Sequence, residues 1–334
     1  MLKVEEQTND TSMARPHVVI LGAGASAAAF PKGDKNGNRL PVMDNLVEVL
    51  QLAAELDKHG IEHKGRNFEG IYSKLYKNGH YSDLVAEIEM RVREYFSSLM
   101  LPEYPTLYDH LVLSLRPKDL IATFNWDPFL YDACSRNHAK VELPKVVYLH
   151  GNVRIGYCIK DMRKGLIDMR CSRCGNFFKP SKLLFPIRQK NYTADLYINS
   201  EWNSLKKILR HAYILTIFGY GAPDSDVEAM SLLRQGWGNP EQRNLEEVEV
   251  IDIKDEDQLI SVWSAFIHTH HYEITGDFYN SWIARYPRRT CEAMWNLLME
   301  LQRPEDYRIP RDLDFPDLWR WYEPLITAER RETH

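Results

Sequence analysis

Residues 17–30 read His-Val-Val-Ile-Leu-Gly-Ala-Gly-Ala-Ser-Ala-Ala-Ala-Phe, and this stretch decides the fold. The apolar run from Val18 to Leu21 suits one buried strand, the glycines at 22 and 24 turn the chain, and a helix opens over 27–29. A strand, a glycine turn and a helix N-terminus form a cradle for a pyrophosphate, because the backbone comes close and its free N–H groups favour negative charge. The spacing is Gly-x-Gly-x-Ser, which is shorter than the full dinucleotide fingerprint. The stretch therefore predicts nucleotide binding, while a Gly-Ala turn without a ligand stays the alternative.

The overall composition is that of a globular protein. The chain has 334 residues, of which 44% are hydrophobic and 27% charged, which suits two domains or one large α/β domain with an insertion. The net charge of −5 gives no basic field for nucleic acid or an anionic membrane surface, and no apolar run is long enough to span a membrane. Residues 1–16 are polar, lack the apolar core of a signal peptide and predict a disordered arm. Five cysteines suit reduced thiols or a metal site, so we expect a cytoplasmic protein.

Further along, short β-branched runs alternate with helical patterns. This alternation predicts a Rossmann-like α/β fold, with a parallel sheet covered on both faces. Beyond 17–21, strands are expected at 120–124, 146–149, 213–218 and 248–252. We place a nucleotide-binding α/β domain at 17–255, with a helical insertion at about 42–115, a small cysteine module at about 152–190, and a C-terminal helical extension at 256–334.

Within the insertion, apolar spacing predicts helices over 43–58, 68–75 and 82–100, with Ser82 as the N-cap of the third. A further helix is expected from about Ser225 to Arg234. Residues 31–41 are rich in Gly, Lys and Asn and predict a mobile loop beside the cradle. Such a loop either closes over a ligand or is a solvated connection.

Polar residues or glycines follow each predicted strand. Because ligands of open α/β sheets bind beyond the carboxyl ends of the strands, these residues are candidates for one site. In chain order they are Gly22, Gly24 and Ser26, then Asn125 and Asp127, then His150, then Gly219 and Gly221, and finally Asp252.

Each of these residues also has a purely structural interpretation. Asp127 precedes Pro128 and is then a helix N-cap, and Asn125 is a turn residue. His150 is then a histidine at a strand end whose ring nitrogens are hydrogen-bonded within the protein, and Asp252 caps a loop. Gly221 begins a plain β-turn.

The order of five short motifs is more specific than any one of them. Gly-Ala-Gly-Ala-Ser, Thr-Phe-Asn-Trp-Asp, Leu-His-Gly, Gly-Tyr-Gly and Val-Ile-Asp follow one another between residues 22 and 252. In this order they resemble the sirtuin family, and most closely the sirtuin-like NAD-cleaving domains of bacterial anti-phage systems. The resemblance covers about 17–255, which is the whole predicted catalytic domain.

The resemblance implies a role for each motif. Gly22, Ala23, Gly24 and Ser26 would hold the NAD+ pyrophosphate. Asn125 would contact the nicotinamide ribose and position the attacking group, Asp127 would bind the carboxamide, and His150 would be the general base. Gly219 and Gly221 would pack against the phosphate and ribose of the cofactor. Asp252 would accept hydrogen bonds from the hydroxyls of the adenosine ribose.

Three departures from the deacylase pattern favour hydrolysis. Phe124 stands where deacylating sirtuins carry Gln, and Asp252 stands where they carry Asn. Residues 183–188 read Leu-Leu-Phe-Pro-Ile-Arg, and the family's Phe-Gly-Glu substrate strand is missing. Without that strand an acyl-lysine peptide has no site for strand addition, so water becomes the acceptor and NAD+ is cleaved to nicotinamide and ADP-ribose. A protein deacylase and a non-enzymatic sensor of NAD+ or ADP-ribose remain the alternatives.

A cysteine knuckle, Cys171-Ser-Arg-Cys174, suggests a structural zinc site. Cys158 lies where a sirtuin's first zinc cysteine would be, and Asp161 stands in place of the second. The resemblance implies Zn2+ bound by these four residues, with a metal-free remnant as the alternative. Cys134 and Cys291 are expected to be buried thiols.

The resemblance also implies a biological setting. An NAD+-depleting effector of anti-phage defence must be inactive in a healthy cell, so control by homo-oligomerisation or a protein partner is expected. Candidate partners are a P-loop translocase-type ATPase or a short Argonaute-like protein. Neither a membrane nor direct binding of nucleic acid is expected.

Overall fold

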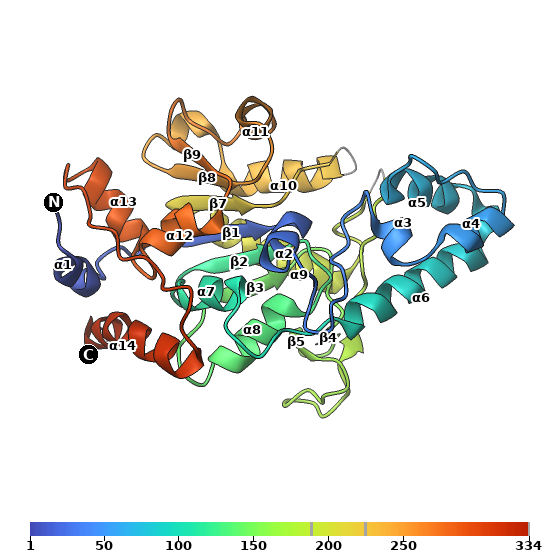
Figure 1. Cartoon of the computed structure of the whole chain (residues 1–334), viewed down its shortest axis with the longest axis horizontal. Helices are drawn as coiled ribbons and strands as arrows, with labels where there is room; N and C mark the ends of the chain where they lie inside the picture. The colour runs from blue at the N-terminus through green and yellow to red at the C-terminus, as the bar shows by residue number, and fades with distance from the viewer. Residues whose placement is uncertain (188–189, 224–225, 333–334) are drawn as a thin grey trace.

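The computed structural model describes residues 1–187, 190–223 and 226–332, and a six-stranded parallel sheet lies at its centre (Figure 1). The strand order is β3-β2-β1-β7-β8-β9, so the direction of winding reverses between β1 and β7. This is the doubly wound order of a Rossmann-like fold, which confirms the predicted fold class. The strands are β1 His17–Leu21, β2 Leu120–Thr123, β3 Lys145–Tyr148, β7 Ile214–Phe218, β8 Glu247–Ile251 and β9 Tyr272–Thr275.

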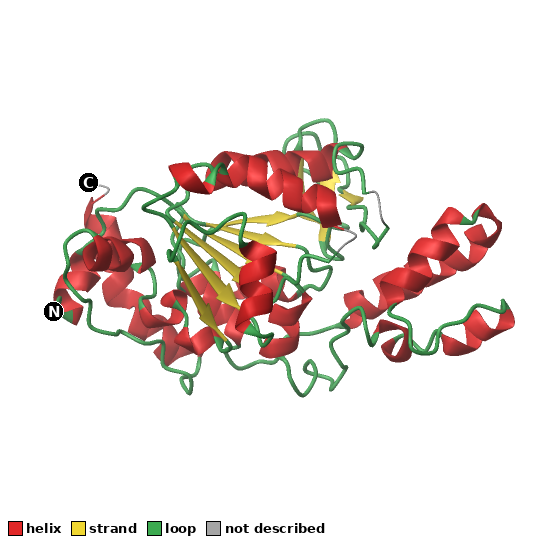
Figure 2. Ribbon diagram, turned by 90° about the horizontal axis from the view of Figure 1, so that it is seen from above, coloured by secondary structure: helices red, strands yellow, loops and turns green. Residues whose placement is uncertain are grey.

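Side-chain alternation along β1 explains why both faces of the sheet are covered. Val18 and Ile20 belong to the apolar cluster on one face, and Val19 and Leu21 to the cluster on the other. Successive residues of a strand point to opposite faces, and a continuous apolar run therefore requires helices on both. One face carries α9 Leu196–Leu209, α10 Val227–Trp237 and α11 Glu256–Trp263, and the other carries α2 Ala23–Ala29, α7 Leu107–Leu113 and α8 Phe129–Asn137 (Figure 2).

The helical insertion projects from one side of the sheet domain (Figures 1 and 2). The helix expected over 43–58 is broken into two, because Gln51 has a φ of 52° that an α-helix cannot contain. The insertion also ends near residue 100, since α7 packs against α8 beneath the sheet. Its elements are α3 Leu46–Val49, α4 Ala53–Lys58, α5 Phe68–Lys77, the 3-10 turn Gly79–Tyr81, and α6 Ser82–Ser98. Ser82 is the first helical residue of α6, and the N-cap is Tyr81.

The cysteine module is a separate three-stranded antiparallel sheet. Its order is β5-β4-β6, with β4 in the middle. The strands are β4 Ile155–Cys158, β5 Arg163–Leu166 and β6 Lys179–Pro180. They lie within the predicted limits of 152–190.

The sheet does not end at residue 255, where the sequence placed the domain boundary. Chain 256–275 forms α11 and β9, and β9 pairs in parallel with β8. The run Tyr-Glu-Ile-Thr of β9 is too short and too polar to stand out as a strand. The elements that follow are the 3-10 turn Phe278–Asn280, α12 Trp282–Arg285, α13 Thr290–Leu298 and α14 Phe315–Glu332. A further 3-10 turn, Pro240–Gln242, precedes β8. Neither α14 nor any other described helix combines the length and apolarity needed to cross a membrane.

Residues 1–16 form an ordered segment in place of the expected disordered arm. Helix α1, Val4–Asn9, lies beside α14 at the end of the molecule where both termini are found (Figure 1). The buried side chain of Gln7 donates to the backbone oxygens of Leu2 and Glu305 at 3.1 and 2.7 Å. The polar residues of this segment thus find partners in the last part of the chain, which composition does not reveal.

Candidate active site

All ten predicted nucleotide-site residues line one cavity of about 470 Å³ at the carboxyl ends of the strands. This is the crevice where the winding of the sheet reverses, and open α/β sheets bind ligands there. The ten residues come from turns far apart in the chain; they are Gly22, Ala23, Gly24, Ser26, Asn125, Asp127, His150, Gly219, Gly221 and Asp252.

The glycine cradle depends on a close approach of two backbone segments. Helix α2 begins at Ala23, earlier than the sequence indicated. Gly24 N donates to Gly219 O at 3.0 Å. A Cβ on Gly22 would lie 2.5 Å from Gly219 O, and a Cβ on Gly219, whose φ is +62°, would lie 2.3 Å from Ala25 N. Side chains at these positions would force the end of β7 away from α2.

Asn125 is held at the floor of the cavity by the cradle itself. Its Nδ2 donates to Gly22 O at 2.9 Å and to Ser26 Oγ at 3.0 Å. Ser26 Oγ lies 2.7 Å from the hydroxyl of Tyr108 and donates to Asp127 Oδ2 at 2.6 Å. Both amide hydrogens of Asn125 are thereby used within the protein, and Oδ1 remains as an acceptor.

Both carboxylate oxygens of Asp127 accept hydrogen bonds within the protein. Its Oδ1 accepts from Phe129 N at 3.3 Å at the start of α8, which is a structural role. Its Oδ2 accepts a hydrogen bond from Ser26 Oγ, which in turn accepts one from Asn125 Nδ2. Burial raises the pKa of the Asp127 carboxyl to about 6, against the opposing hydrogen bond from Ser26.

His150 is buried against aromatic side chains. Its Nε2 lies 2.8 Å from the hydroxyl of Tyr192, and the ring of Phe124 meets it edge-on with centroids 4.7 Å apart. Burial lowers the pKa of His150 to about 3, and the charge of Lys190 acts in the same direction. The imidazole is therefore neutral at physiological pH, which is the form that a general base requires, and its lowered pKa makes it a weak base.

The sequence analysis did not identify Asp226, whose carboxylate lies next to the hydroxyl of Tyr192, the partner of His150. Asp226 Oδ2 accepts from the hydroxyl of Tyr220 at 3.0 Å, and Oδ1 lies 3.5 Å from that of Tyr192 and pairs with Lys190. Burial opposes the charge of Asp226, but the charge of Lys190 and the hydrogen bonds from Lys190 and Tyr220 act against it, and the pKa of this carboxyl is lowered. The run Ala-Pro-Asp-Ser-Asp was interpreted as a turn before a helix.

No pattern in the irregular segment 152–190 marked Lys190, and Tyr192 follows that segment without a signal of its own. Ser225, the expected start of the helix after this turn, lies outside the described residues. The helix described there, α10, begins at Val227.

The Gly/Lys/Asn-rich segment beside the cradle is fastened to the insertion. Asp34 Oδ1 accepts from the backbone N–H groups of Asn36 and Asn38 at 2.9 and 2.8 Å. Its Oδ2 accepts from Met100 N at 2.9 Å, just beyond α6. The residues that follow, 40–44, line the cavity. The end of this segment, Leu40 and Pro41, therefore forms part of the cavity wall.

At the other end of the cavity, Asp252 is half-buried and accepts from Lys254 N at 3.1 Å. Lys254 also lines the cavity, and its Nζ would lie 2.9 Å from a Cβ on Gly221. The sequence did not single out this cation. It stands where it would offset the charge of a phosphate near Gly221.

The four predicted metal ligands come together in the cysteine module. The ligand atoms of Cys158, Asp161, Cys171 and Cys174 all lie within 4.8 Å of one another. The sulfurs of Cys158 and Cys174 are 3.4 Å apart, and Asp161 Oδ2 lies 3.3 Å from the sulfur of Cys171. Three thiolates and a carboxylate at such separations fit a closed tetrahedral zinc site.

We expect purified protein to contain about one zinc per chain, and Cys171→Ser to lose it. The three-stranded module has little apolar core, so loss of the metal should unfold it first. Metal analysis together with limited proteolysis of residues 152–190 measures both effects.

Cys134→Ser is the matched control, because Cys134 lies on α8 away from the module. Fully folded, protease-resistant protein without metal would contradict the zinc assignment.

Comparisons with known proteins give a fold-level likeness only. No protein-family model matches the chain, and no curated protein matches it. Similar solved structures include Sir2 proteins. A Sir2 homologue in complex with NAD is 14% identical, with a TM-score of 0.35 over 89% of this chain and 92% of that one. A Sir2 homologue mutant with ADP-ribose is 14% identical, with a TM-score of 0.38 over 88% and 93%. A Sir2 bound to acetylated peptide is 12% identical, with a TM-score of 0.33 over 88% and 95%.

Proposed function

We propose that this protein hydrolyses NAD+ to nicotinamide and ADP-ribose. One observation carries the proposal: Asn125 and His150, which follow different strands, line the same cavity as the glycine cradle. A site that only bound a nucleotide would need the cradle but neither an oriented amide nor a neutral buried histidine.

The residues fit the chemistry of the nicotinamide–ribose bond. As this bond breaks, the ribose carbon gains oxocarbenium character and nicotinamide leaves with the bonding electrons. Asn125 Oδ1 is the acceptor that would orient a ribose hydroxyl or the attacking water. As the water oxygen bonds to the ribose carbon, neutral His150 takes the proton. Asp127, held by Ser26, would bind the carboxamide.

Two features support water over an acyl-lysine peptide as the acceptor. Residues 181–187 contain no strand, so the described part of this segment provides no edge for a peptide. Phe124 stacks on Tyr220 with centroids 4.0 Å apart and an interplanar angle of 9°. Where deacylases place a polar glutamine, this cavity therefore has an aromatic wall.

The test is NAD+ consumption by purified protein with identification of the products. Wild type should release equal amounts of nicotinamide and ADP-ribose. Asn125→Ala should lower kcat about 10²-fold or more, because the reacting groups lose their orientation. Asn280→Ala, which changes an exposed asparagine that does not line the cavity, is the matched control.

Two outcomes would contradict the proposal. NAD+ binding without turnover would favour a sensor. Turnover only with an acylated peptide would favour a deacylase.

The resemblance of the motifs extends the proposal to anti-phage defence in the cytoplasm. An enzyme that depletes NAD+ must be restrained until infection, and we propose that homo-oligomerisation or a protein partner provides this control. A P-loop translocase-type ATPase or a short Argonaute-like protein would fill the partner's role. Full activity of the isolated monomer would remove the reason for a partner.

A further inference from the structure

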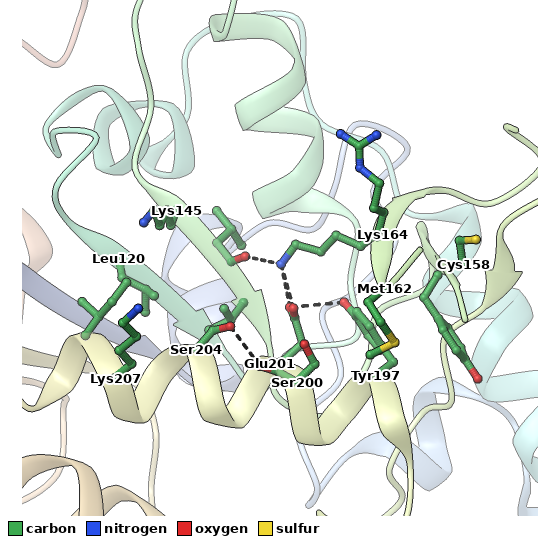
Figure 3. Close-up of a pocket in the computed structure, with 15 residues that line it drawn as sticks. Leu120, Lys145, Cys158, Met162, Lys164, Tyr197, Ser200, Glu201, Ser204 and Lys207 are labelled. Carbon is green, nitrogen blue, oxygen red and sulfur yellow. Dashed lines mark hydrogen bonds and ion pairs between the residues drawn. The ribbon is translucent and has the colours of Figure 1, made fainter. Parts of the chain in front are cut away.

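A second cavity, of about 570 Å³, lies between the cysteine module, α9 and the outer edge of β3 (Figure 3). It is separate from the nucleotide cavity, and the two have no lining residue in common. Its volume is in the range of small-molecule sites. Glu201 of α9 is at its centre, with Lys164 reaching across to it from β5.

Two outward-facing backbone groups of β3 are already hydrogen-bonded, which opposes the addition of a strand along this cavity. Glu201 Oε2 accepts from Tyr148 N at 2.8 Å, and Lys164 Nζ donates to Val146 O at 2.5 Å. These are outward-facing backbone groups that an added peptide strand would need. A ligand of this cavity must therefore be recognised by side chains.

The side chains that remain are mostly cationic. Lys164 pairs with Glu201 at 2.7 Å, and the hydroxyl of Tyr197 also donates to Glu201 at 3.2 Å. Three further cations line the cavity from β3, β5 and α9; they are Lys145, Arg163 and Lys207. Among the described residues, none of the three has a carboxylate partner.

This surplus of positive charge is local, because the chain as a whole carries a net charge of −5. The hydroxyl of Ser200 adds a hydrogen-bonding group on α9, whereas that of Ser204 already donates to Ser200 O at 2.9 Å (Figure 3). Several cations that line one cavity suit a ligand that carries more than one negative charge.

We propose that this cavity binds a small phosphorylated ligand of nucleotide size, and that binding regulates the site around His150. The second part of this proposal, regulation, rests on the proposed hydrolysis of NAD+. Phosphate oxygens would draw the ammonium of Lys164 away from Glu201 and leave this buried carboxylate without its counter-charge.

Helix α9 joins the two cavities physically. Glu201 bonds the backbone of Tyr148, which lies two residues before His150. The next residue of α9, Trp202, packs against Tyr192 and Phe124, with ring centroids 4.9 and 5.9 Å apart. Both aromatic residues contact His150. A shift of α9 would therefore move the support of the general base.

The binding test uses inorganic pyrophosphate as the probe, with ADP in parallel, and isothermal titration calorimetry of the full chain. Lys145→Ala/Lys207→Ala should bind pyrophosphate at least about tenfold more weakly than wild type, because it loses two converging charges. Lys74→Ala/Lys77→Ala is the matched control, since it removes two exposed lysines from α5. Tighter binding of ADP than of pyrophosphate, lost in the cavity variant alone, would show that the cavity also accepts the nucleoside. Equal affinity in the two double variants would overturn the proposal.

The regulatory half has its own readout. Pyrophosphate should change the rate of NAD+ turnover at least about threefold in wild type relative to the Lys145→Ala/Lys207→Ala variant. Binding to the cavity in a protein that does not cleave NAD+ would overturn the proposed function and leave the anion site standing. An active enzyme whose cavity binds pyrophosphate with no difference in turnover between the two proteins would overturn the regulation.

Discussion

Replacement of His150 by alanine is expected to lower the kcat for NAD+ cleavage by about 10²–10⁴-fold, the usual contribution of a general base. The affinity for NAD+ should change little, because the cradle and Asn125 are on other strands. Steady-state kinetics with a separate binding measurement distinguish these effects. His270→Ala, at an exposed histidine that does not line the cavity, should behave as wild type. An active His150→Ala enzyme would contradict the assigned base.

The hydroxyl of Tyr192 gives a finer version of this test. Tyr192 accepts a hydrogen bond from Nε2 if its own proton is directed to Asp226, which leaves Nδ1 free to take a proton. Tyr192→Phe keeps the ring but removes this partner. We expect kcat to fall by up to about 10²-fold through misorientation, with KM unchanged. An equal rise in KM would instead indicate a general disturbance of the cavity.

The pH profile separates His150 from Asp127. With a pKa lowered to about 3, His150 stays deprotonated as the pH falls from 8 to 5, so its protonation causes no loss of rate there. Asp127, with a pKa raised to about 6, gains a proton within this range. Any change of kcat centred near pH 6 should therefore disappear in Asp127→Asn. A limb near pH 6.5 that persists in this variant would contradict the lowered pKa of His150.

Substitution of Gly219 by alanine should have the largest structural effect. The residue has a φ of +62°, and its new Cβ would lie 2.3 Å from Ala25 N. The left-handed conformation costs a non-glycine residue about 1–2 kcal/mol, and overpacking against fixed backbone costs about 1–3 kcal/mol. We expect the free energy of unfolding to fall by about 2–5 kcal/mol, together with loss of NAD+ binding.

Urea unfolding and NAD+ titration of Gly219→Ala measure these two effects. Gly79→Ala is the matched control, because a Cβ there meets no atom within 4 Å and the φ of Gly79 is not positive. Its stability should stay close to that of wild type. Wild-type stability and NAD+ affinity in Gly219→Ala would show that α2 and β7 need not approach so closely.

The residues that the sequence predicted are those whose position follows from local pattern. Val18 to Leu21 form an apolar run that suits a buried strand, and the glycine turn after it favours that assignment. The convergence of Asn125 and His150 then follows from parallel topology, since the carboxyl ends of all such strands share one edge. The sheet therefore organises much of the site without any knowledge of side-chain contacts.

What the sequence did not reveal depends on contacts between distant segments. Strand β9 has four residues, and its assignment requires the neighbouring strand β8. Asp226 becomes important only because Tyr192, from an unrelated stretch, lies beside it. The helix α1 forms where composition suggested disorder, because its polar groups meet the backbone of Glu305. Such pairings carry no periodicity that a single sequence could display.

The late position of β9 and α14 in the chain has a consequence for biosynthesis. Every residue of the nucleotide cavity has been translated by Lys254, but Asp252 N bonds Thr275 O only when β9 is in place. Leu318 and Tyr322 of α14 later pack beneath Leu113, at the end of α7. A nascent chain therefore lacks part of the scaffold around the cavity until β9 and α14 have been synthesised. We expect NAD+ cleavage to begin only after both elements have folded onto the sheet domain.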